Sequence, residues 1–141
     1  MPHSPEAFED IVDAFAYLDD WEDRYAHVIE LGRAMPPLVE TQKSSASKVE
    51  GCASQVWIVP RLDEAASPAR LHFDGDSDAL IVKGLIAILH ALMSGRTRED
   101  IVAVDVEAQL ARLDLREHLS SQRSNGLKAM IARLKGLAAP G

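Results

Sequence analysis

Cysteine is scarce in this sequence. Cys52 is the only one among 141 residues. A single cysteine cannot form a disulfide within the chain, and it leaves no C-x-x-C pair for a dithiol redox cycle. Zinc and iron–sulfur sites usually take several sulfur or imidazole ligands. We therefore expect no resident metal, and the cysteine usage is typical of a reducing cytosol.

The sequence also lacks a long apolar run and a basic leader. Its longest apolar stretch, ALIVKGLIAILHALM, is interrupted by Lys83 and His90. It falls short of the roughly 20 residues that span a bilayer. The first ten residues, MPHSPEAFED, have neither the basic start nor the apolar centre of a signal peptide. We expect a cytoplasmic protein without membrane contact.

Basic residues are outnumbered, 15 against 22 acidic ones, for a formal net charge of -7. This balance argues against a nucleic-acid partner, because phosphate binding needs clustered Lys and Arg. The charge is also uneven, since residues 1–40 are strongly acidic and residues 116–141 are mostly basic. We interpret both segments as solvated helix faces, with a protein-docking surface as the alternative.

The patterns that are present indicate one domain over residues 1–141. Ser4 and Pro5 predict a helix start, and apolar spacing predicts a second helix over about 21–35. β-Branched and aromatic residues over 55–62, followed by alternation over 70–74, predict an antiparallel hairpin. Val49 is expected to close a short strand before it.

The second half of the chain reads as helical. GDSDALIVKGLIAILHALMSG, residues 75–95, begins with Asp and Ser at capping positions and is apolar around most of its circumference. It predicts the central buried helix. One or two short helices over 97–115 and a final helix in LSSQRSNGLKAMIARLKGLA follow. The order predicts the α+β class, with helices packed on a small antiparallel sheet.

Cys52 lies in KVEGCASQVW, a loop sequence with small neighbours. Gly51 permits backbone angles that other residues avoid, and Ala53 and Ser54 add little bulk. These features support a small core side chain and an approachable thiol about equally. An approachable lone thiol is suited to exchange chemistry, in which it attacks a sulfur on a partner and carries that sulfur away.

The SQRSNG segment places Arg123 near a predicted helix start, where capping and a functional role are both supported. A guanidinium near Cys52 would favour its thiolate, and Glu50 would act the other way. The sequence leaves open which of the two lies closer.

Other groups of polar residues favour structural interpretations. HFDGDSDA contains Asp74, Asp76 and Asp78, but the EF-hand pattern needs a downstream glutamate that is absent, so we favour a turn and a helix cap. Four scattered histidines are interpreted as surface or hydrogen-bonded core residues, and no motif pairs one with Cys52. They are His27, His72, His90 and His118.

Four blocks resemble the SufE family of sulfur-acceptor proteins, in the family's order and spacing: WEDRYAHVIELG, VEGCASQVW, DSDALIVKGLIA and LSSQRSNGLKAM. The resemblance covers nearly the whole chain. It implies a SufE/IscU-like fold and a protein that is a partner and activator of a cysteine desulfurase rather than an enzyme. The pyridoxal phosphate cofactor would belong to that partner, of the SufS or CsdA type, and a downstream iron–sulfur scaffold would receive the sulfur.

The resemblance also implies roles for individual residues. Cys52 matches the cysteine that takes a persulfide sulfur from the desulfurase, with Gly51 and Ser54 in its loop. Arg123 matches an arginine of the C-terminal motif, in a support or interaction role. Asp76 and Asp78 match an acidic pair near the cysteine loop.

Two positions depart from the family's pattern. Asp23 stands where glutamate is usual, and Ser121 replaces a proline before Arg123. The second change puts the placement of that arginine in question, because it alters the rigidity of the turn.

The acceptor role leads to a hypothesis about the loop. We expect one tucked and one extended position of the cysteine loop, with the loaded sulfur sheltered by Val49, Val56 and Trp57. The alternatives are an iron–sulfur scaffold, a one-cysteine redox protein, and an interaction module with an inert cysteine. The sequence leaves a homodimer open.

Overall fold

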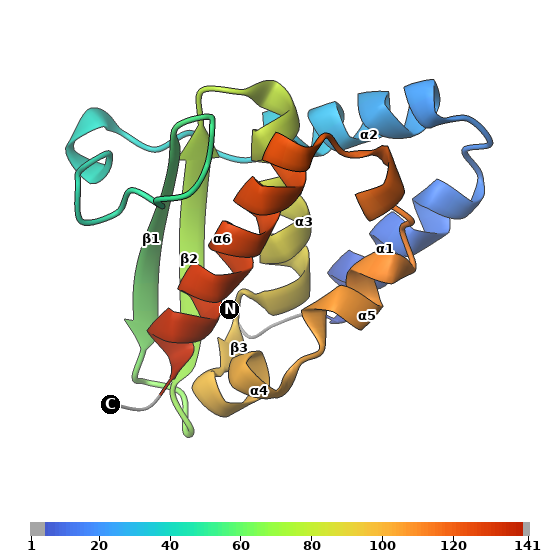
Figure 1. Cartoon of the computed structure of the whole chain (residues 1–141). Helices are drawn as coiled ribbons and strands as arrows, with labels where there is room; N and C mark the ends of the chain where they lie inside the picture. The colour runs from blue at the N-terminus through green and yellow to red at the C-terminus, as the bar shows by residue number, and fades with distance from the viewer. Residues whose placement is uncertain (1–4, 140–141) are drawn as a thin grey trace.

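The computed structural model describes residues 5–139, and the predicted α+β class is confirmed (Figure 1). The predicted cap at Ser4 lies outside the described residues. In chain order the helices and strands are α1 Pro5–Ala16, α2 Trp21–Ala34, a 3-10 helix Glu40–Gln42, β1 Val56–Asp63, β2 Arg70–Ser77, α3 Leu80–Met93, β3 Arg96–Thr97, α4 Arg98–Ala103, α5 Val106–Ala111, a 3-10 helix Arg116–His118 and α6 Ser121–Ala138.

The sheet has the order β1-β2-β3 and is antiparallel. The predicted hairpin is confirmed, but β2 continues past Asp74 to Ser77, which pairs with Val56. Aspartate and glycine are poor strand formers, yet cross-strand pairing and packing decide strand length. The strand packs closely against α3 at Gly75, because a Cβ atom there would lie only 2.6 Å from Cγ2 of Ile86. Before β1, an isolated bridge joins Lys48 to Trp57 in place of the short strand expected at Val49.

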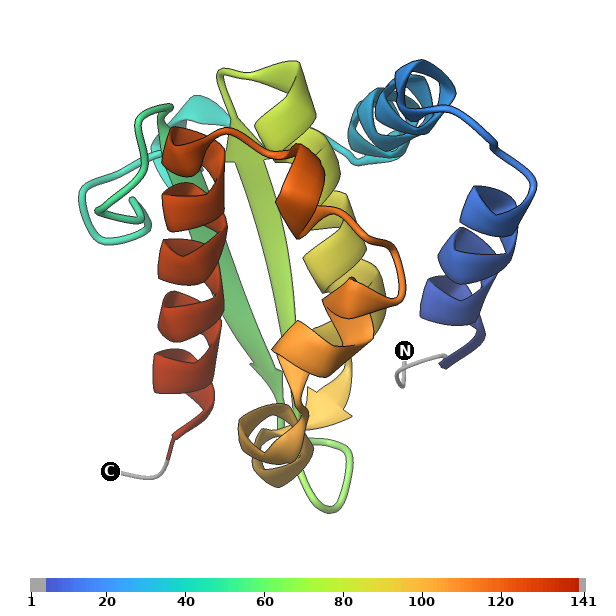
Figure 2. The same cartoon turned by 45° about the vertical axis from the view of Figure 1, so that its right-hand side comes forward.

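Helices α3 and α6 lie side by side on one face of the sheet, and α1 and α2 pack on α3 from the other side (Figures 1 and 2). The prediction of a central buried helix is confirmed, because most side chains of α3 are buried. Within the described residues, no helix is long and apolar enough to cross a membrane. The segment before β1, the start of α3 and the start of α6 meet at the same end of the sheet (Figure 1).

Helices α2 and α3 touch through their backbones at two glycines. A Cβ atom on Gly84 would lie 2.2 Å from the carbonyl oxygen of Val28, and one on Gly32 would lie 2.7 Å from the amide nitrogen of Gly84. Any side chain at these positions would push the helices apart, and the buried core around Val28 would open. This crossing therefore fixes α2 against α3.

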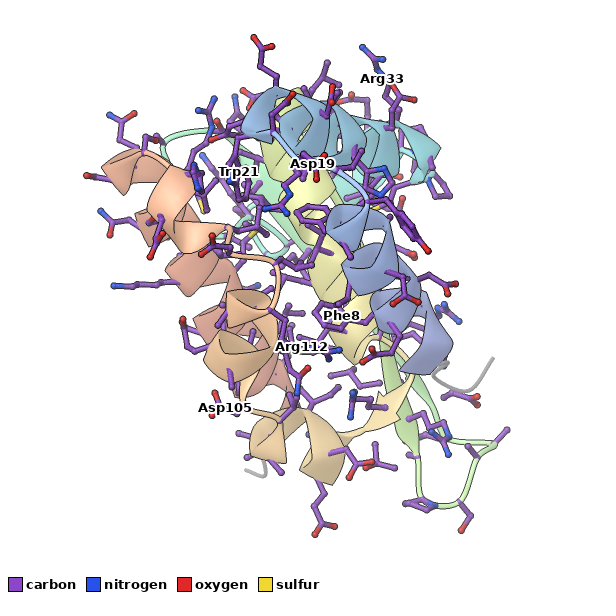
Figure 3. All side chains as sticks on the ribbon, turned by 90° about the vertical axis from the view of Figure 1, so that its right-hand side faces the viewer. Phe8, Asp19, Trp21, Arg33, Asp105 and Arg112 are labelled. Atoms are coloured by element: carbon purple, nitrogen blue, oxygen red, sulfur yellow. The ribbon has the colours of Figure 1, made fainter. Side chains whose placement is uncertain are left out.

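A second long-range contact holds α1 against the end of α5. The guanidinium of Arg112 donates to both carboxylate oxygens of Glu9 at 2.7 Å and lies over the ring of Phe8, as Figure 3 shows for the two labelled side chains. The hydrogen bonds from Arg112 lower the pKa of Glu9. Because both side chains are exposed, we expect little net stabilisation from this pair.

The helix starts agree only in part with the expected caps. Ser120 caps α6 by accepting a hydrogen bond from the backbone N–H of Arg123. The expected Asp and Ser caps of α3 are wrong, since the cap residue is Ala79 and its side chain makes no capping bond. Ser77 accepts from the Ala79 N–H just before the helix, and the Asp78 carboxylate is used elsewhere.

The glycine crossing predicts that Gly84→Ala destabilises the protein by about 3 kcal/mol or more, because overpacking here meets backbone rather than a flexible side chain. Gly136→Ala in α6 is the matched control, since a Cβ atom there has nothing within 4 Å. It should stabilise the protein by about 0.5–1 kcal/mol through helix propensity. Urea unfolding checks both values, and equal effects of the two variants would contradict the crossing's role.

Candidate functional site

The loop that carries Cys52 is held at both ends by hydrogen bonds. At its start the Val49 N–H donates to the Val56 carbonyl at 2.8 Å, and the Ile58 N–H donates to the Ser47 carbonyl at the same distance. Arg133 of α6 also donates to the carbonyl of Ala46 at 2.6 Å. These contacts fix the chain on the N-terminal side of the cysteine.

At its far end the loop is tied to the start of α3. The Asp78 carboxylate accepts a hydrogen bond from the Gln55 N–H at 3.0 Å, and the Asp78 N–H donates back to the Gln55 carbonyl at 3.3 Å. The Ser77 hydroxyl donates to that same carbonyl at 2.7 Å. Asp78, one of the predicted site residues, is therefore a tether of the loop rather than a helix cap.

Between these anchors the cysteine turns in against α6. Gly51 has a φ of 91°, a region that residues with a side chain rarely adopt, so glycine is required at the bend. The half-buried Cys52 thiol lies 3.6 Å from the carbonyl oxygen of Gly126, to which its S–H donates. A Cβ atom on Gly126 would lie 3.6 Å from the sulfur, so the missing side chain leaves the space beside the thiol free.

The surroundings of the Cys52 thiol disfavour its thiolate form. Burial raises the pKa of Cys52 above its usual value, and the negative charge of Glu50 raises it further. Among charged neighbours, Glu50 is the one whose charge contributes to this shift. In this position Cys52 is a poor nucleophile, since the thiolate is the reactive form.

A cavity of about 290 Å³ opens beside the sulfur, between the loop, α3 and α6. It brings together three predicted site residues, Cys52, Ser54 and Arg123. The other lining residues were not predicted; they are Ala53, Val82, Leu85, Ser120, Gln122, Gly126 and Met130. Arg123, Gly126 and Met130 are spaced so that they share one face of a helix, and this spacing could have predicted that they line the cavity together. No local sequence pattern predicts that α3 forms the facing wall.

The three residues expected to shelter the loaded sulfur are not among those that line the cavity beside the thiol. Val49 and Val56 are buried in the main core, and the ammonium of Lys43 lies over the ring of Trp57 at 5.2 Å. The apolar wall of the cavity is formed instead by side chains of α3 and α6, namely Val82, Leu85 and Met130.

Asp76 is a buried anchor for the segment that precedes the loop. Its carboxylate accepts hydrogen bonds from the backbone N–H groups of Leu38 at 3.0 Å and Ser77 at 2.9 Å. The ammonium groups of Lys83 and Lys43 lie 3.5 and 3.7 Å away. Burial alone would raise the pKa of Asp76, but these donors and cations outweigh it and hold the pKa below its usual value. The residue joins the chain before the loop, β2 and α3.

The histidines take no part in the cavity, whose described lining residues include none. His118 stacks on Trp21 at 3.8 Å, and His27 and His90 contact the rings of Phe15 and Phe73. The expectation of a hydrogen-bonded core histidine is wrong for Nε2 of His72, which is buried with no partner among the described residues.

A small group of metal-type donors lies elsewhere. Asp114, Glu117 and His118 are exposed, with ligand atoms within 4.8 Å of one another. Exposed acidic groups commonly cluster without binding an ion. In a metal site the ligands are usually held in place by hydrogen bonds from surrounding residues. The exposure of this group therefore gives no support for a metal site.

Comparisons with known proteins agree on one family. The model of the SufE family, described as an Fe-S metabolism associated domain, matches residues 9–138. An uncharacterized SufE-like protein of Rhizobium meliloti is 48% identical over 132 residues, covering 94% of this chain and 94% of the relative. A second, from Rhizobium etli, is 47% identical over 139 residues, covering 96% and 94%.

A solved structure shows the same fold. The solution structure of a hypothetical protein from Thermus thermophilus superimposes with a TM-score of 0.70. The match covers 98% of this chain and 96% of that one at 19% sequence identity, so it speaks for the fold alone.

The environment of Asp76 predicts that Asp76→Asn destabilises the protein by about 3 kcal/mol at neutral pH, because Lys83 and Lys43 lose their buried counter-charge. Asp74→Asn, on the same strand but only half-buried, should cost much less. Because the folded pKa of Asp76 is lowered, its stabilisation is present above the unfolded carboxyl pKa of about 4 and is lost as the pH falls through the folded value. Urea unfolding at several pH values measures this, and a pH-independent difference would contradict the assignment.

The environment of Cys52 predicts slow alkylation at neutral pH. The rate with iodoacetamide should rise with pH to a midpoint above that of the same chain unfolded in urea. Glu50→Gln should lower the midpoint by less than unfolding does, because burial is the larger cause. A folded midpoint equal to or below the unfolded one would show that the thiol is not held as described.

Proposed function

The chain belongs to the SufE family, which is associated with Fe-S metabolism, and on that premise we propose that Cys52 accepts sulfur from the persulfide of a cysteine desulfurase. The observation that carries the proposal is the placement of the chain's one thiol, at the bend of a loop anchored at both ends and beside a cavity that has room for another sulfur atom.

The transfer is a thiol–persulfide exchange. The Cys52 thiolate attacks the outer sulfur of the partner's cysteine persulfide, a bond forms between the two sulfurs, and the partner's cysteine leaves as a thiolate. Cys52 then carries the persulfide, and the desulfurase is free for another turnover, which accounts for its stimulation. The pyridoxal phosphate that a desulfurase uses to release sulfur from L-cysteine belongs to the partner.

The tucked position explains why the thiol is inert until it is needed. Burial and Glu50 keep Cys52 protonated in the free protein. Moving the loop out of the cavity removes the burial by this chain, which is the larger cause of the raised pKa, and so increases the thiolate fraction. We expect the loop to move between the hydrogen bonds at Val49 and Gln55, which tie its two ends.

The return of the loop shelters the product. A loaded Cys52 that folds back places its outer sulfur in the cavity against Val82, Leu85 and Met130, away from reductants in solvent. The sulfur would then pass to an iron–sulfur scaffold, with Arg123 at the cavity rim and Gly51 and Ser54 in the moving loop.

The competing functions fit the site less well. A one-cysteine redox sensor needs a low thiol pKa, whereas the pKa of Cys52 is raised. A scaffold that assembles a cluster needs several soft ligands, and the sequence offers one cysteine.

Intact-protein mass spectrometry tests the proposal. Incubation with a desulfurase of the SufS or CsdA type and L-cysteine, without reductant, should add sulfur to the chain, and dithiothreitol should remove it. Cys52→Ser keeps the size of the side chain and should gain no sulfur and give no stimulation of the desulfurase. Stimulation that survives in Cys52→Ser would favour a plain interaction module instead.

A further inference from the structure

The cavity beside Cys52 has two unlike walls. One wall is apolar and comes mainly from α3 and the interior face of α6. The other is polar and carries a cation; it is formed by Ser54, Ser120, Gln122 and Arg123. The apolar wall alone can shield a sulfur from water, and the polar wall with its cation adds the capacity to bind an anion.

The polar wall of the cavity carries a positive charge, although the acidic Glu50 lies next to Cys52 in the sequence. Glu50 acts on Cys52 through its charge, but it is not among the residues that line the cavity, whereas Arg123 is. Among the residues whose side chains are described, the guanidinium of Arg123 has no hydrogen-bond or ion-pair partner; the helix cap uses only its backbone N–H. Its five donors are available to a ligand, and a planar guanidinium matches a carboxylate in bidentate geometry.

The size of the cavity indicates a small ligand. At about 290 Å³ it lies just below the range for small-molecule pockets, about 300–1,000 Å³. It suits a compact metabolite that extends from the thiol to the rim, rather than a folded segment of another protein.

We propose that this cavity binds small thiols that carry a carboxylate, with Arg123 holding the carboxylate and the Cys52 sulfur as the reacting atom. A loaded Cys52 then passes its sulfur to such a thiol as well as to a protein. The sulfur-transfer part rests on the proposed function above; the preference of the cavity for an anion does not.

The transfer balances without any further reagent. The thiolate of the small molecule attacks the outer sulfur of the Cys52 persulfide, the bond between that sulfur and Cys52 Sγ breaks, and the small molecule becomes a persulfide. Cys52 leaves as a thiolate and takes up a proton to return to its resting form. The positive charge of Arg123 favours the entering anion.

Alkylation of the free protein tests the anion preference directly. The ratio of the rates with iodoacetate and iodoacetamide at one pH cancels the thiolate fraction of Cys52. Arg123→Gln should lower this ratio by about fivefold, the size expected of one solvent-accessible charge pair. Arg123→Lys should keep most of the ratio, and Lys128→Gln, an exposed cation on α6 outside the cavity, should leave it unchanged. Circular dichroism checks that each variant is folded.

Sulfur discharge tests the acceptor. Protein loaded on Cys52 and freed of reductant is mixed with 3-mercaptopropionate or with uncharged 2-mercaptoethanol, at equal thiolate concentration. The carboxylate thiol should remove the sulfur several times faster, and Arg123→Gln should abolish the difference. An unchanged alkylation ratio in Arg123→Gln, or equal discharge by the two thiols, overturns the proposal and assigns Arg123 to a protein partner. Failure of Cys52 to load at all would refute the proposed function, and the alkylation ratio would still decide the anion preference.

Discussion

The anchoring of the cysteine loop at its two ends is the constraint on which the site depends. Hydrogen bonds at Val49 and Gln55 hold the loop to β1 and to the start of α3, and they leave the bend at Gly51 and Cys52 between them. A loop fixed at both ends has little conformational entropy left to lose when it takes a new position. The same anchors aim the cysteine at α6, and under the proposed function they also allow it to extend into the partner.

The hydrogen bonds that anchor the loop depend on the packing of β2, α2 and α3 against one another. Asp76 joins the chain before the loop to β2 and to Lys83 of α3, and α3 is held in place by the close glycine crossing with α2. The buried face of α3 then supplies one wall of the cavity and α6 supplies the other. The thiol is therefore surrounded by parts of the chain that are distant in sequence, and its raised pKa is a consequence of that packing.

The strongly periodic segments could be predicted from sequence because their signals are local. The hairpin, the buried helix α3 and the final helix all appear where alternation, apolar content and spacing predict them. The bend at Gly51 was also accessible from the sequence, and the resemblance to a family singled out Arg123 as a support or interaction residue.

The predictions that the structure did not confirm depended on contacts between residues that are far apart in the sequence. The aspartates before α3 read as caps, but Asp76 binds the Leu38 N–H and Asp78 binds the Gln55 N–H, contacts that no local pattern specifies. The expected shelter residues, Val49, Val56 and Trp57, are close to Cys52 in sequence, whereas the apolar wall of the cavity beside the thiol comes from α3 and α6. The extension of β2 through two aspartates and a glycine likewise depends on its pairing with β1 and on Ile86.

Hydrogen–deuterium exchange with and without a cysteine desulfurase tests the central claim, that the loop moves between fixed anchors. We predict that the amides of residues 50–54 change their protection when the partner binds, while those of Val49 and Ile58, bonded to Val56 and Ser47, do not. Equal protection throughout residues 49–55 in the two states would contradict that claim.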